Sequence, residues 1–231
     1  MLVFKDTITG LAAGVRLTSN DMLHKGDWIT VKSVDANGIV EDMSLTTVKV
    51  RNFDNTIVTI SPITLVNGSF QNWIGMQKSG GRRVKRVVYF DFRSVRLVDE
   101  TLKRNLLAKH FATEDSFKLK ESLQKAIDKD IQEGKDIEDL KNPAALAPTN
   151  LQLYRKFMEK YLRQRPEVNT DLTLMVRHME ATQCGLPIEF YFFIKDKVWV
   201  NYEHILADIM EHAYALANEF GLKIYEQYPE Q

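Results

Sequence analysis

Apolar and polar residues alternate along residues 26–60, and two turn-forming sequences interrupt the alternation. The turns are Asp35-Ala36-Asn37-Gly38 and Asp54-Asn55, and the alternating segments cover residues 26–31, 39–53 and 56–60. A period of two with Asn-Gly and Asp-Asn turns is typical of short antiparallel strands joined by tight hairpins. Strands this short close only a small barrel or a strongly bent sheet. We therefore predict a compact all-β domain at residues 23–74.

The first 22 residues follow a different pattern, dense in small side chains. The central run consists of Gly10, Leu11, Ala12, Ala13 and Gly14. We expect a helix over residues 2–17, which ends at the cap-forming run 18–21. Each glycine inside a helix costs roughly 1 kcal/mol relative to alanine, and glycines four residues apart let helices approach closely, as membrane and pore helices do. A short surface helix that happens to carry glycines is the simpler alternative on the pattern alone.

Residues 75–231 mix strands with helices. The expected strands cover residues 84–92, 172–177, 188–193 and a closing segment 223–225, and the expected helices cover 99–141, 150–162 and 203–220, with Asn150 as the cap of the second. This order of elements is the split βαβ arrangement of a ferredoxin-like fold. A charged helical stretch at about 99–149, with the apolar stripe Leu119, Leu123, Ile127 and Ile131 and a stop at Gly134, is longer than that fold requires. The predicted class is therefore mixed β and α+β, with a helical insertion.

Composition narrows the functional class. Lys+Arg and Asp+Glu both number 31, which argues against a general nucleic-acid binder because phosphate contacts usually need a basic surplus. The single cysteine, Cys184, excludes an intramolecular disulfide and suits a reducing compartment. No run of about 18 apolar residues is present, so we expect no membrane span within these residues. Because Met1 directly precedes sequence typical of a helix interior, we expect the chain to be part of a longer one.

No motif predicts catalysis. His204, Asp208 and His212 recur four residues apart on the last predicted helix, a spacing that can present metal ligands. Their helical angle places them away from the apolar stripe of that helix, so a solvated face is the better interpretation. The glycines at 75–81 lack the Lys-Ser/Thr ending of a phosphate loop. We therefore expect no enzymatic activity, no metal and no cofactor.

Four basic residues crowd the start of the first strand in the second part of the chain: Arg82, Arg83, Lys85 and Arg86. A charge run of this kind is usually a solvated edge. Clustered positive charge also creates a local field that acts on passing anions. Both interpretations stay open from the residues alone.

Several short motifs stand in a fixed order over residues 8–73: Gly10-Leu11-Ala12-Ala13-Gly14-Val15-Arg16-Leu17, Gly26-Asp27-Trp28-Ile29, Gly38-Ile39-Val40-Glu41, Leu45-Thr46-Thr47-Val48, Asp54, Ile60-Ser61-Pro62 and Asn72-Trp73. In this order they resemble the small-conductance mechanosensitive channel (MscS) family. Residues 186–190 and 202–205 extend the resemblance weakly toward the C-terminus. With its charged insertion, the chain looks closest to the YbdG-type (miniconductance-like) branch. Ile63 and Gly10 depart from the family, which often has asparagine at these positions, and Arg16 adds a charge.

The resemblance implies a domain order. Residues 1–22 would be the end of a pore-lining helix, residues 23–74 a small Sm-like β-barrel domain, and residues 75–231 a ferredoxin-like α/β domain with the insertion at about 99–149. Residues Leu11 to Gly14 match the segment after the bend of the pore helix, which packs against the β domain, and Gly10 precedes them. The basic residues at 82–86 would lie near the portals through which ions pass.

The resemblance also implies a function and partners. Family members are homo-oligomers, generally heptamers, in the cytoplasmic membrane, and here the bilayer contacts would lie in transmembrane helices missing from this chain. The soluble parts face the cytoplasm and form a hollow cage, and the pore releases ions and small solutes on hypo-osmotic shock. The expected location is the bacterial inner membrane, with no nucleic acid as partner. The alternative from the residues is a soluble Sm-like RNA-binding or scaffold module.

Overall fold

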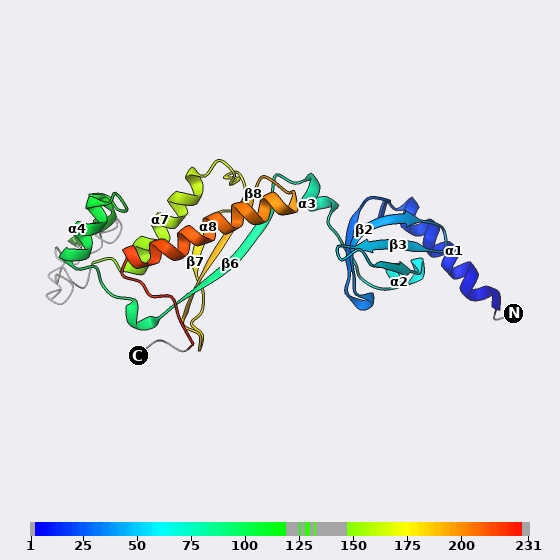
Figure 1. Cartoon of the computed structure of the whole chain (residues 1–231), viewed down its shortest axis with the longest axis horizontal. Helices are drawn as coiled ribbons and strands as arrows, with labels where there is room; N and C mark the ends of the chain where they lie inside the picture. The colour runs from blue at the N-terminus through cyan, green and yellow to red at the C-terminus, as the bar shows by residue number, and fades with distance from the viewer. Residues whose placement is uncertain (1–2, 119–124, 126–127, 130–131, 133–146, 228–231) are drawn as a thin grey trace. The chain divides into compact units, whose positions relative to one another are not determined.

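The computed structural model describes residues 3–118, 125, 128–129, 132 and 147–227. It divides into two compact units, Met1–Ser79 and Gly80–Gln231, which are drawn in Figure 1. The apolar stripe predicted for residues 119–131 and the stop at Gly134 lie outside the described residues. Among the helices that are described, none is both long enough and apolar enough to cross a membrane.

The first unit is an antiparallel sheet with a helix at its start. Its elements are α1 (Val3–Ser19), β1 (Trp28–Val31), η1 (Lys32–Val34), β2 (Ala36–Met43), β3 (Val48–Asn52), β4 (Ile57–Ile60), α2 (Pro62–Asn67), β5 (Gln71–Asn72) and α3 (Ile74–Lys78). The five strands pair in the order β4-β3-β2-β1-β5. The two edge strands, β4 and β5, do not pair with each other among the described residues, so the small barrel expected from strand length is an open sheet.

Alternation along the strands produces the core of the first unit. Inward-facing residues of β1, β2 and β3 are buried, and outward-facing ones are exposed or half-buried. Leu17 from α1 and Leu65 from α2 join this core and are 0% and 1% exposed. Burying one leucine side chain stabilises a fold by about 1.5–3 kcal/mol. The helix α1 is therefore held by the same hydrophobic cluster that holds the sheet together.

The first predicted turn is displaced by three residues. The chain reverses at η1 and at Asp35, which has a left-handed φ of 52°, whereas Asn37 and Gly38 lie inside β2. A β-carbon on Gly38 would lie 1.9 Å from the carbonyl oxygen of Arg51 on β3, so only glycine fits there. The Asn-Gly pair thus serves a close approach of strands and not a hairpin turn. The second predicted turn is confirmed, with Asn55 at φ 69°.

The second unit has the ferredoxin-like order of elements. Its elements are β6 (Arg82–Phe90), η2 (Phe92–Ser94), α4 (Glu100–Ala108), η3 (Glu114–Phe117), α7 (Asn150–Gln164), β7 (Met175–His178), β8 (Leu186–Ile194) and α8 (Trp199–Glu219). The strands pair antiparallel in the order β6-β8-β7. The predicted closing strand is reduced to a single bridge between Phe90 and Ile224, on the free side of β6.

Helices α7 and α8 cover one face of this sheet (Figure 1). The buried residues of β6, which include Val84 and Val88, pair with apolar residues of β8. The buried residues of the two strands pack in one hydrophobic core with both helices. The Tyr154 hydroxyl on α7 donates a hydrogen bond to the Ala213 carbonyl on α8 at 2.6 Å. Burial raises the pKa of Tyr154 above its ordinary value. This bond fixes the two helices to each other beneath the sheet.

Asn150 does not cap α7 as the sequence suggested. The cap is Thr149, whose hydroxyl accepts the backbone N–H of Gln152 at 3.1 Å. Asn150 is instead 0% exposed, and its amide donates to the carbonyls of Ser94 and Phe220. Because a buried amide needs partners, Asn150 joins three separated segments of the second unit.

Candidate functional site

The N-terminal helix contacts the β domain through one side only. Ala13 is 4% exposed and Leu17 is 0% exposed, and Leu17 belongs to the hydrophobic core of the β domain. Gly14 lies between them, and a β-carbon there would lie 2.1 Å from the carbonyl oxygen of Leu45. Leu45 belongs to the turn between β2 and β3, so the backbone of α1 touches the backbone of the β domain directly. Only glycine permits this contact.

The other residues expected in this contact lie elsewhere. Gly10 has open space around its α-carbon, since a β-carbon added there would have no heavy atom within 4 Å. Leu11 is 37% exposed, and Ala12 is also exposed. Of the five residues from Gly10 to Gly14, the structure brings Ala13 and Gly14 to the β domain. Leu17, one turn further on, was not among the residues expected in this contact, although it ends the same motif.

A second apolar stripe on α1 faces away from this contact. Ile8, Leu11 and Val15 are 64%, 37% and 52% exposed. Their spacing of three and four residues puts them on one side of the helix. The stripe is uncovered by the described part of the chain.

The loop that follows α1 is tied to β5, the last strand of the β domain, through Asp27 and Asn72. The Asp27 carboxylate is 7% exposed and accepts the backbone N–H of His24 at 3.0 Å and the Asn72 amide at 2.8 Å. The Asn72 amide also donates to the Met22 carbonyl at 3.3 Å, and its oxygen accepts the backbone N–H of Ile74 at 2.9 Å. A buried carboxylate is stable only when it is bonded in this way. The sequence contained both residues in separate motifs without revealing that they meet.

Two tryptophans reinforce the same end of the sheet. The Trp28 and Trp73 rings stack with centroids 4.7 Å apart. The Trp73 indole donates to the Thr30 hydroxyl at 3.0 Å, and the Trp28 indole donates to Asn37 at 3.0 Å. Each buried or half-buried indole N–H therefore has an acceptor. The result is a rigid junction where the chain leaves β5.

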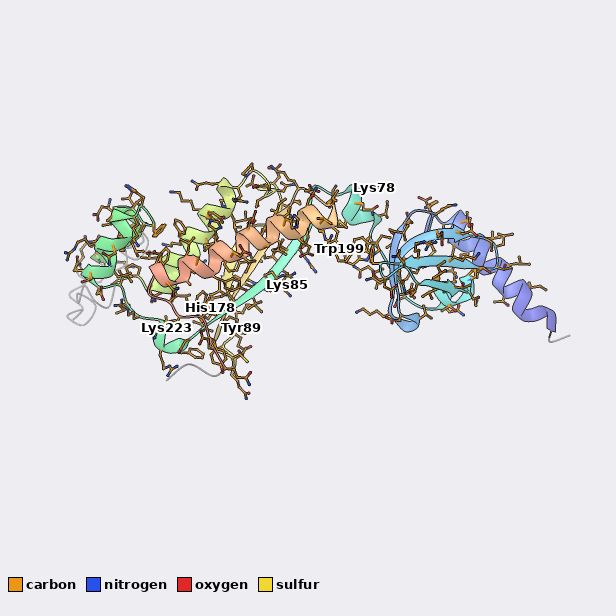
Figure 2. The ribbon with its side chains drawn as sticks, viewed as in Figure 1. Lys78, Lys85, Tyr89, His178, Trp199 and Lys223 are labelled. Atoms are coloured by element: carbon orange, nitrogen blue, oxygen red, sulfur yellow. The ribbon has the colours of Figure 1, made fainter. Side chains whose placement is uncertain are left out.

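The four basic residues of β6 do not form one uniform patch. Lys85, labelled in Figure 2, lies 3.6 Å from the Glu189 carboxylate on β8, whose side chain is 0% exposed. The Arg177 guanidinium on β7 holds the same carboxylate at 2.6 Å and, with Lys85, keeps the pKa of Glu189 below its ordinary value. Lys85 is thus partly neutralised by a carboxylate that the sheet buries.

The remaining three arginines differ from one another. The Arg82 guanidinium lies 4.3 Å from the centroid of the Tyr202 ring, a cation–π contact. Arg83 and Arg86 are exposed, and neither has an ion pair within the described residues. Arg83 and Arg86 are therefore the exposed cations of this strand without an ion pair among the described residues, whereas the exposed Lys85 lies beside Glu189.

The candidate metal face on α8 is solvated. His204, Asp208 and His212 are all exposed. A ring nitrogen of His212 bonds the backbone carbonyl of Asp208 at 2.9 Å, and the ring stacks on Tyr161. No group of three or more His, Cys, Asp or Glu side chains suited to a metal ion occurs within the described residues. Cys184 is exposed and free.

Sequence comparisons identify the first unit. Residues 6–75 match the family model "Mechanosensitive ion channel, beta-domain". The small-conductance mechanosensitive channel MscMJ of Methanocaldococcus jannaschii is 32% identical over 71 residues, which are 31% of this chain and 20% of that protein. An uncharacterised MscS family protein of Aquifex aeolicus is 33% identical over 111 residues, which are 47% of this chain and 29% of the relative. The chain thus spans under a third of the length of these relatives.

Solved structures agree over the whole described fold. The structure of Arabidopsis thaliana MSL1 superposes with a TM-score of 0.63 at 11% identity, covering 98% of this chain and 61% of that one. The closed state of Helicobacter pylori MscS gives 0.59 at 14% identity, covering 100% of this chain and 66% of the other. Likeness at such low identity shows the fold alone. None of these matches distinguishes the miniconductance-like branch, which stays a prediction. Residues 6–75 are therefore a mechanosensitive ion channel β domain, similar in sequence to MscS family proteins, and both units share the fold of solved MscS-type structures.

Proposed function

We propose that this chain joins the pore helix of a mechanosensitive channel to a vestibule on the cytoplasmic side. In this proposal residues 1–22 are the end of the pore helix, residues 23–74 the β domain, and residues 75–231 the α/β wall with its insertion. The observation that carries it is the backbone contact between Gly14 and Leu45. A helix in such close backbone contact with a β domain can transmit its own displacement to that domain.

The physical basis for coupling is the density of the contact. Close-packed interiors have low compressibility and transmit displacement instead of absorbing it. Ala13, Gly14 and Leu17 form the surface by which α1 contacts the β domain, which we call the seat of the helix. At Gly14 no side chain separates the helix backbone from the backbone of the β domain. A shift of α1 must therefore move the turn between β2 and β3 or break the seat. In this proposal Gly10, Leu11 and Ala12 lie outside the seat.

The uncovered stripe on α1 supports assembly with further copies of the chain. Ile8, Leu11 and Val15 would each gain burial if the helices of neighbouring subunits packed around a pore. We propose a homo-oligomer, with a heptamer as the expected state of the complete protein. Its bilayer contacts would lie in helices outside this chain, in the bacterial inner membrane, with both units facing the cytoplasm.

The proposed activity is the release of ions and small solutes when membrane tension rises during hypo-osmotic shock. It rests on the relatives, one of which is named as a small-conductance mechanosensitive channel. The exposed Arg83 and Arg86 would act electrostatically on ions that pass the portals of the vestibule. Arg82 and Lys85 would contribute less, because each is engaged by a neighbour.

The test uses the complete gene product in a bacterial host that lacks its own mechanosensitive channels. We expect the wild-type protein to restore survival after hypo-osmotic shock and to give tension-activated currents in membrane patches. Gly14→Ala should shift the tension that opens the channel, and Gly10→Ala, its matched control in open space, should leave it unchanged. A complete, membrane-inserted protein that gives no tension-activated current would overturn the proposal.

The RNA-binding alternative has less support. An RNA-binding module would be expected to match nucleic-acid-binding proteins, whereas the matching proteins are MscS family members. Two of the four cations on β6 are also occupied within the unit. Salt-sensitive RNA affinity in a filter-binding assay would favour the alternative.

A further inference from the structure

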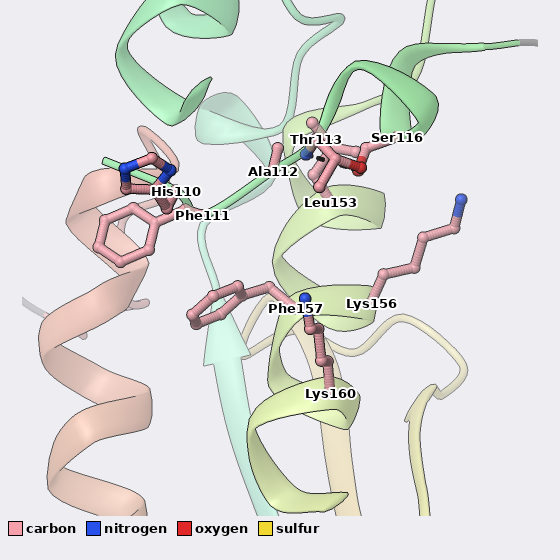
Figure 3. Close-up of a pocket in the computed structure, with 9 residues that line it drawn as sticks. All are labelled: His110, Phe111, Ala112, Thr113, Ser116, Leu153, Lys156, Phe157 and Lys160. Carbon is pink, nitrogen blue, oxygen red and sulfur yellow. Dashed lines mark hydrogen bonds between the residues drawn. The ribbon is translucent and has the colours of Figure 1, made fainter. Parts of the chain in front are cut away.

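A hollow of ≈ 160 Å³ lies in the second unit, between α7 and the segment that follows α4 (Figure 3). One wall comes from α7, and the other comes from residues 110–116. The lining residues are His110, Phe111, Ala112, Thr113, Ser116, Leu153, Lys156, Phe157 and Lys160. The mechanical role proposed above uses none of them.

The floor of the hollow is aromatic and rigid. The Phe111 and Phe157 rings meet edge to face with centroids 5.2 Å apart. Both rings also contact Phe220 at the end of α8, at 5.9 Å and 5.7 Å. Since each ring is held by two others, the floor is preformed and presents an apolar aromatic surface to a ligand.

The rim of the hollow is positively charged. Lys156 and Lys160 leave neighbouring turns of α7, and Figure 3 shows both among the lining residues together with His110. The lining contains no acidic residue. Like charges four residues apart on a helix repel by about 0.2–0.5 kcal/mol, and no ion pair relieves either lysine within the described residues. An anion between the two lysines would remove this repulsion.

Two nearby carboxylates, Asp115 and Glu159, are already engaged. Asp115 lies 2.6 Å from Lys118, and this pairing lowers the pKa of Asp115. Glu159, next to Lys160 in sequence, accepts the backbone N–H of Val176 at 3.0 Å. Neither is among the residues that line the hollow. The two lysines therefore have no carboxylate of the hollow to compete with an incoming anion.

Two hydroxyl groups add a directional donor. The Ser116 hydroxyl oxygen accepts the backbone N–H of Thr113 at 3.1 Å, and the Thr113 and Ser116 hydroxyls are 3.2 Å apart. A bond between two hydroxyls uses one of their two protons. The other proton is left to donate to a ligand oxygen at the edge of the hollow.

We propose that this hollow binds a small dianion with an aromatic body, that is, an aryl phosphate monoester. The ring would lie on Phe111 and Phe157, and the phosphate oxygens would reach Lys156, Lys160 and the free hydroxyl proton. Two ammonium groups match the charge of about −2 that a phosphate monoester carries near neutral pH. The volume of the hollow is large enough for one aromatic ring. The proposal stands independently of channel activity.

The test is a calorimetric titration of the purified 231-residue chain with phenyl phosphate, inorganic phosphate and benzoate. We expect phenyl phosphate to bind at least tenfold more tightly than either of the other two probes, because only it offers both the ring and the dianion. The double variant Lys156→Gln/Lys160→Gln should lower the affinity for phenyl phosphate at least tenfold. The matched control Lys32→Gln/Lys49→Gln removes the same charge from exposed positions in the first unit and should change it less than twofold.

Three results would overturn the proposal. They are equal affinities for phenyl phosphate and inorganic phosphate, equal losses in the two double variants, and no binding of phenyl phosphate at millimolar concentration. Thermal unfolding of each variant shows whether it is folded during the titration. Channel recordings are not part of the readout, so failure here and failure of the proposed channel function are distinguishable.

Discussion

A β-carbon on Gly14 would lie 2.1 Å from the carbonyl oxygen of Leu45, closer than any real side-chain contact. The two residues are far apart in sequence, since Gly14 lies in α1 and Leu45 lies in the turn between β2 and β3. Their contact makes this turn of the β domain a neighbour of the helix backbone. The strength of this seat can be measured in the isolated chain.

Gly14→Ala should destabilise the first unit, although alanine is the better helix former. The added methyl group must displace the Leu45 backbone, and overpacking of this kind typically costs about 1–3 kcal/mol. Gly10→Ala is the matched control, because the same change in open space should stabilise the helix by up to about 1 kcal/mol. Urea unfolding followed by tryptophan fluorescence measures both. Equal effects of the two substitutions would show that the seat is not formed in solution.

Leu17→Ala should lower the free energy of unfolding of the first unit by about 2–5 kcal/mol, because it leaves a cavity in the hydrophobic core. Leu11→Ala removes the same atoms from a residue that is 37% exposed and should change stability by about 0.5 kcal/mol or less. Thermal unfolding of the two variants gives the comparison. A small effect of Leu17→Ala would mean that α1 is not anchored in the core of the sheet.

Asp27 and Asn72 should be energetically coupled. Removing either partner leaves a polar group of the α1–β1 loop unsatisfied, at a cost of about 1–3 kcal/mol. The variants Asp27→Ala and Asn72→Ala and their combination form a double-mutant cycle, and contacting residues give coupling energies of about 0.5–3 kcal/mol. Strict additivity of the two single effects would contradict the 2.8 Å bond between them.

Glu189 should make the second unit sensitive to acid. Because Arg177 and Lys85 hold its pKa below the unfolded value, its stabilising contribution is present above the unfolded pKa and is lost as the pH falls through the folded one. Wild-type protein should therefore lose more stability than Glu189→Gln between pH 7 and the acidic range below the ordinary glutamate pKa. Urea unfolding across that range is the measurement. Arg177→Gln should weaken the effect more than Lys85→Gln, because its contact is 2.6 Å against 3.6 Å. Identical pH profiles of wild type and Glu189→Gln would refute the assignment.

Ion selectivity should depend on two of the four basic residues on β6. In the channel proposed above, Arg83→Gln/Arg86→Gln should shift the permeability ratio of anions to cations, because these charges face solvent without an ion pair within the described residues. Lys85→Gln is the control, since buried Glu189 already offsets that charge. Reversal potentials in asymmetric salt measure the ratio. An equal shift by Lys85→Gln, or no shift by any of them, would remove the arginines from the conduction path.

The spacing of apolar residues predicted much of the fold, because it directly reflects which face of each strand or helix is buried. Strand alternation between Trp28 and Ile60 reflects which side of each strand is buried, and the long helix that ends near Phe220 follows from its apolar spacing. The failures have distant causes. Gly38 is needed for Arg51 on another strand, and Asn150 is needed for the Phe220 carbonyl.

The candidate site was harder to predict for the same reason. The run from Gly10 to Gly14 pointed to the right segment, but which of its residues touch the sheet depends on the rotation of α1 about its axis. That rotation is set by Leu17 and by the backbone of Leu45, which stand in two separate motifs that do not reveal their contact with the same helix face. The partial neutralisation of Lys85 likewise required knowing that Glu189 lies diagonally across from it on the neighbouring strand β8.

Asn72 binds the loop that follows α1 through its amide and the start of α3 through its oxygen. The points where the chain enters and leaves the β domain therefore share one side chain. A pull applied along α1 can reach the exit of the domain through Met22, Asn72 and Ile74, without first straining the ladders of β2, β3 and β4. The sheet would then stay undeformed while force passes through the short path formed by Met22, Asn72 and Ile74. Shortening or weakening this path would change how force leaves the β domain while the hydrophobic core stays folded.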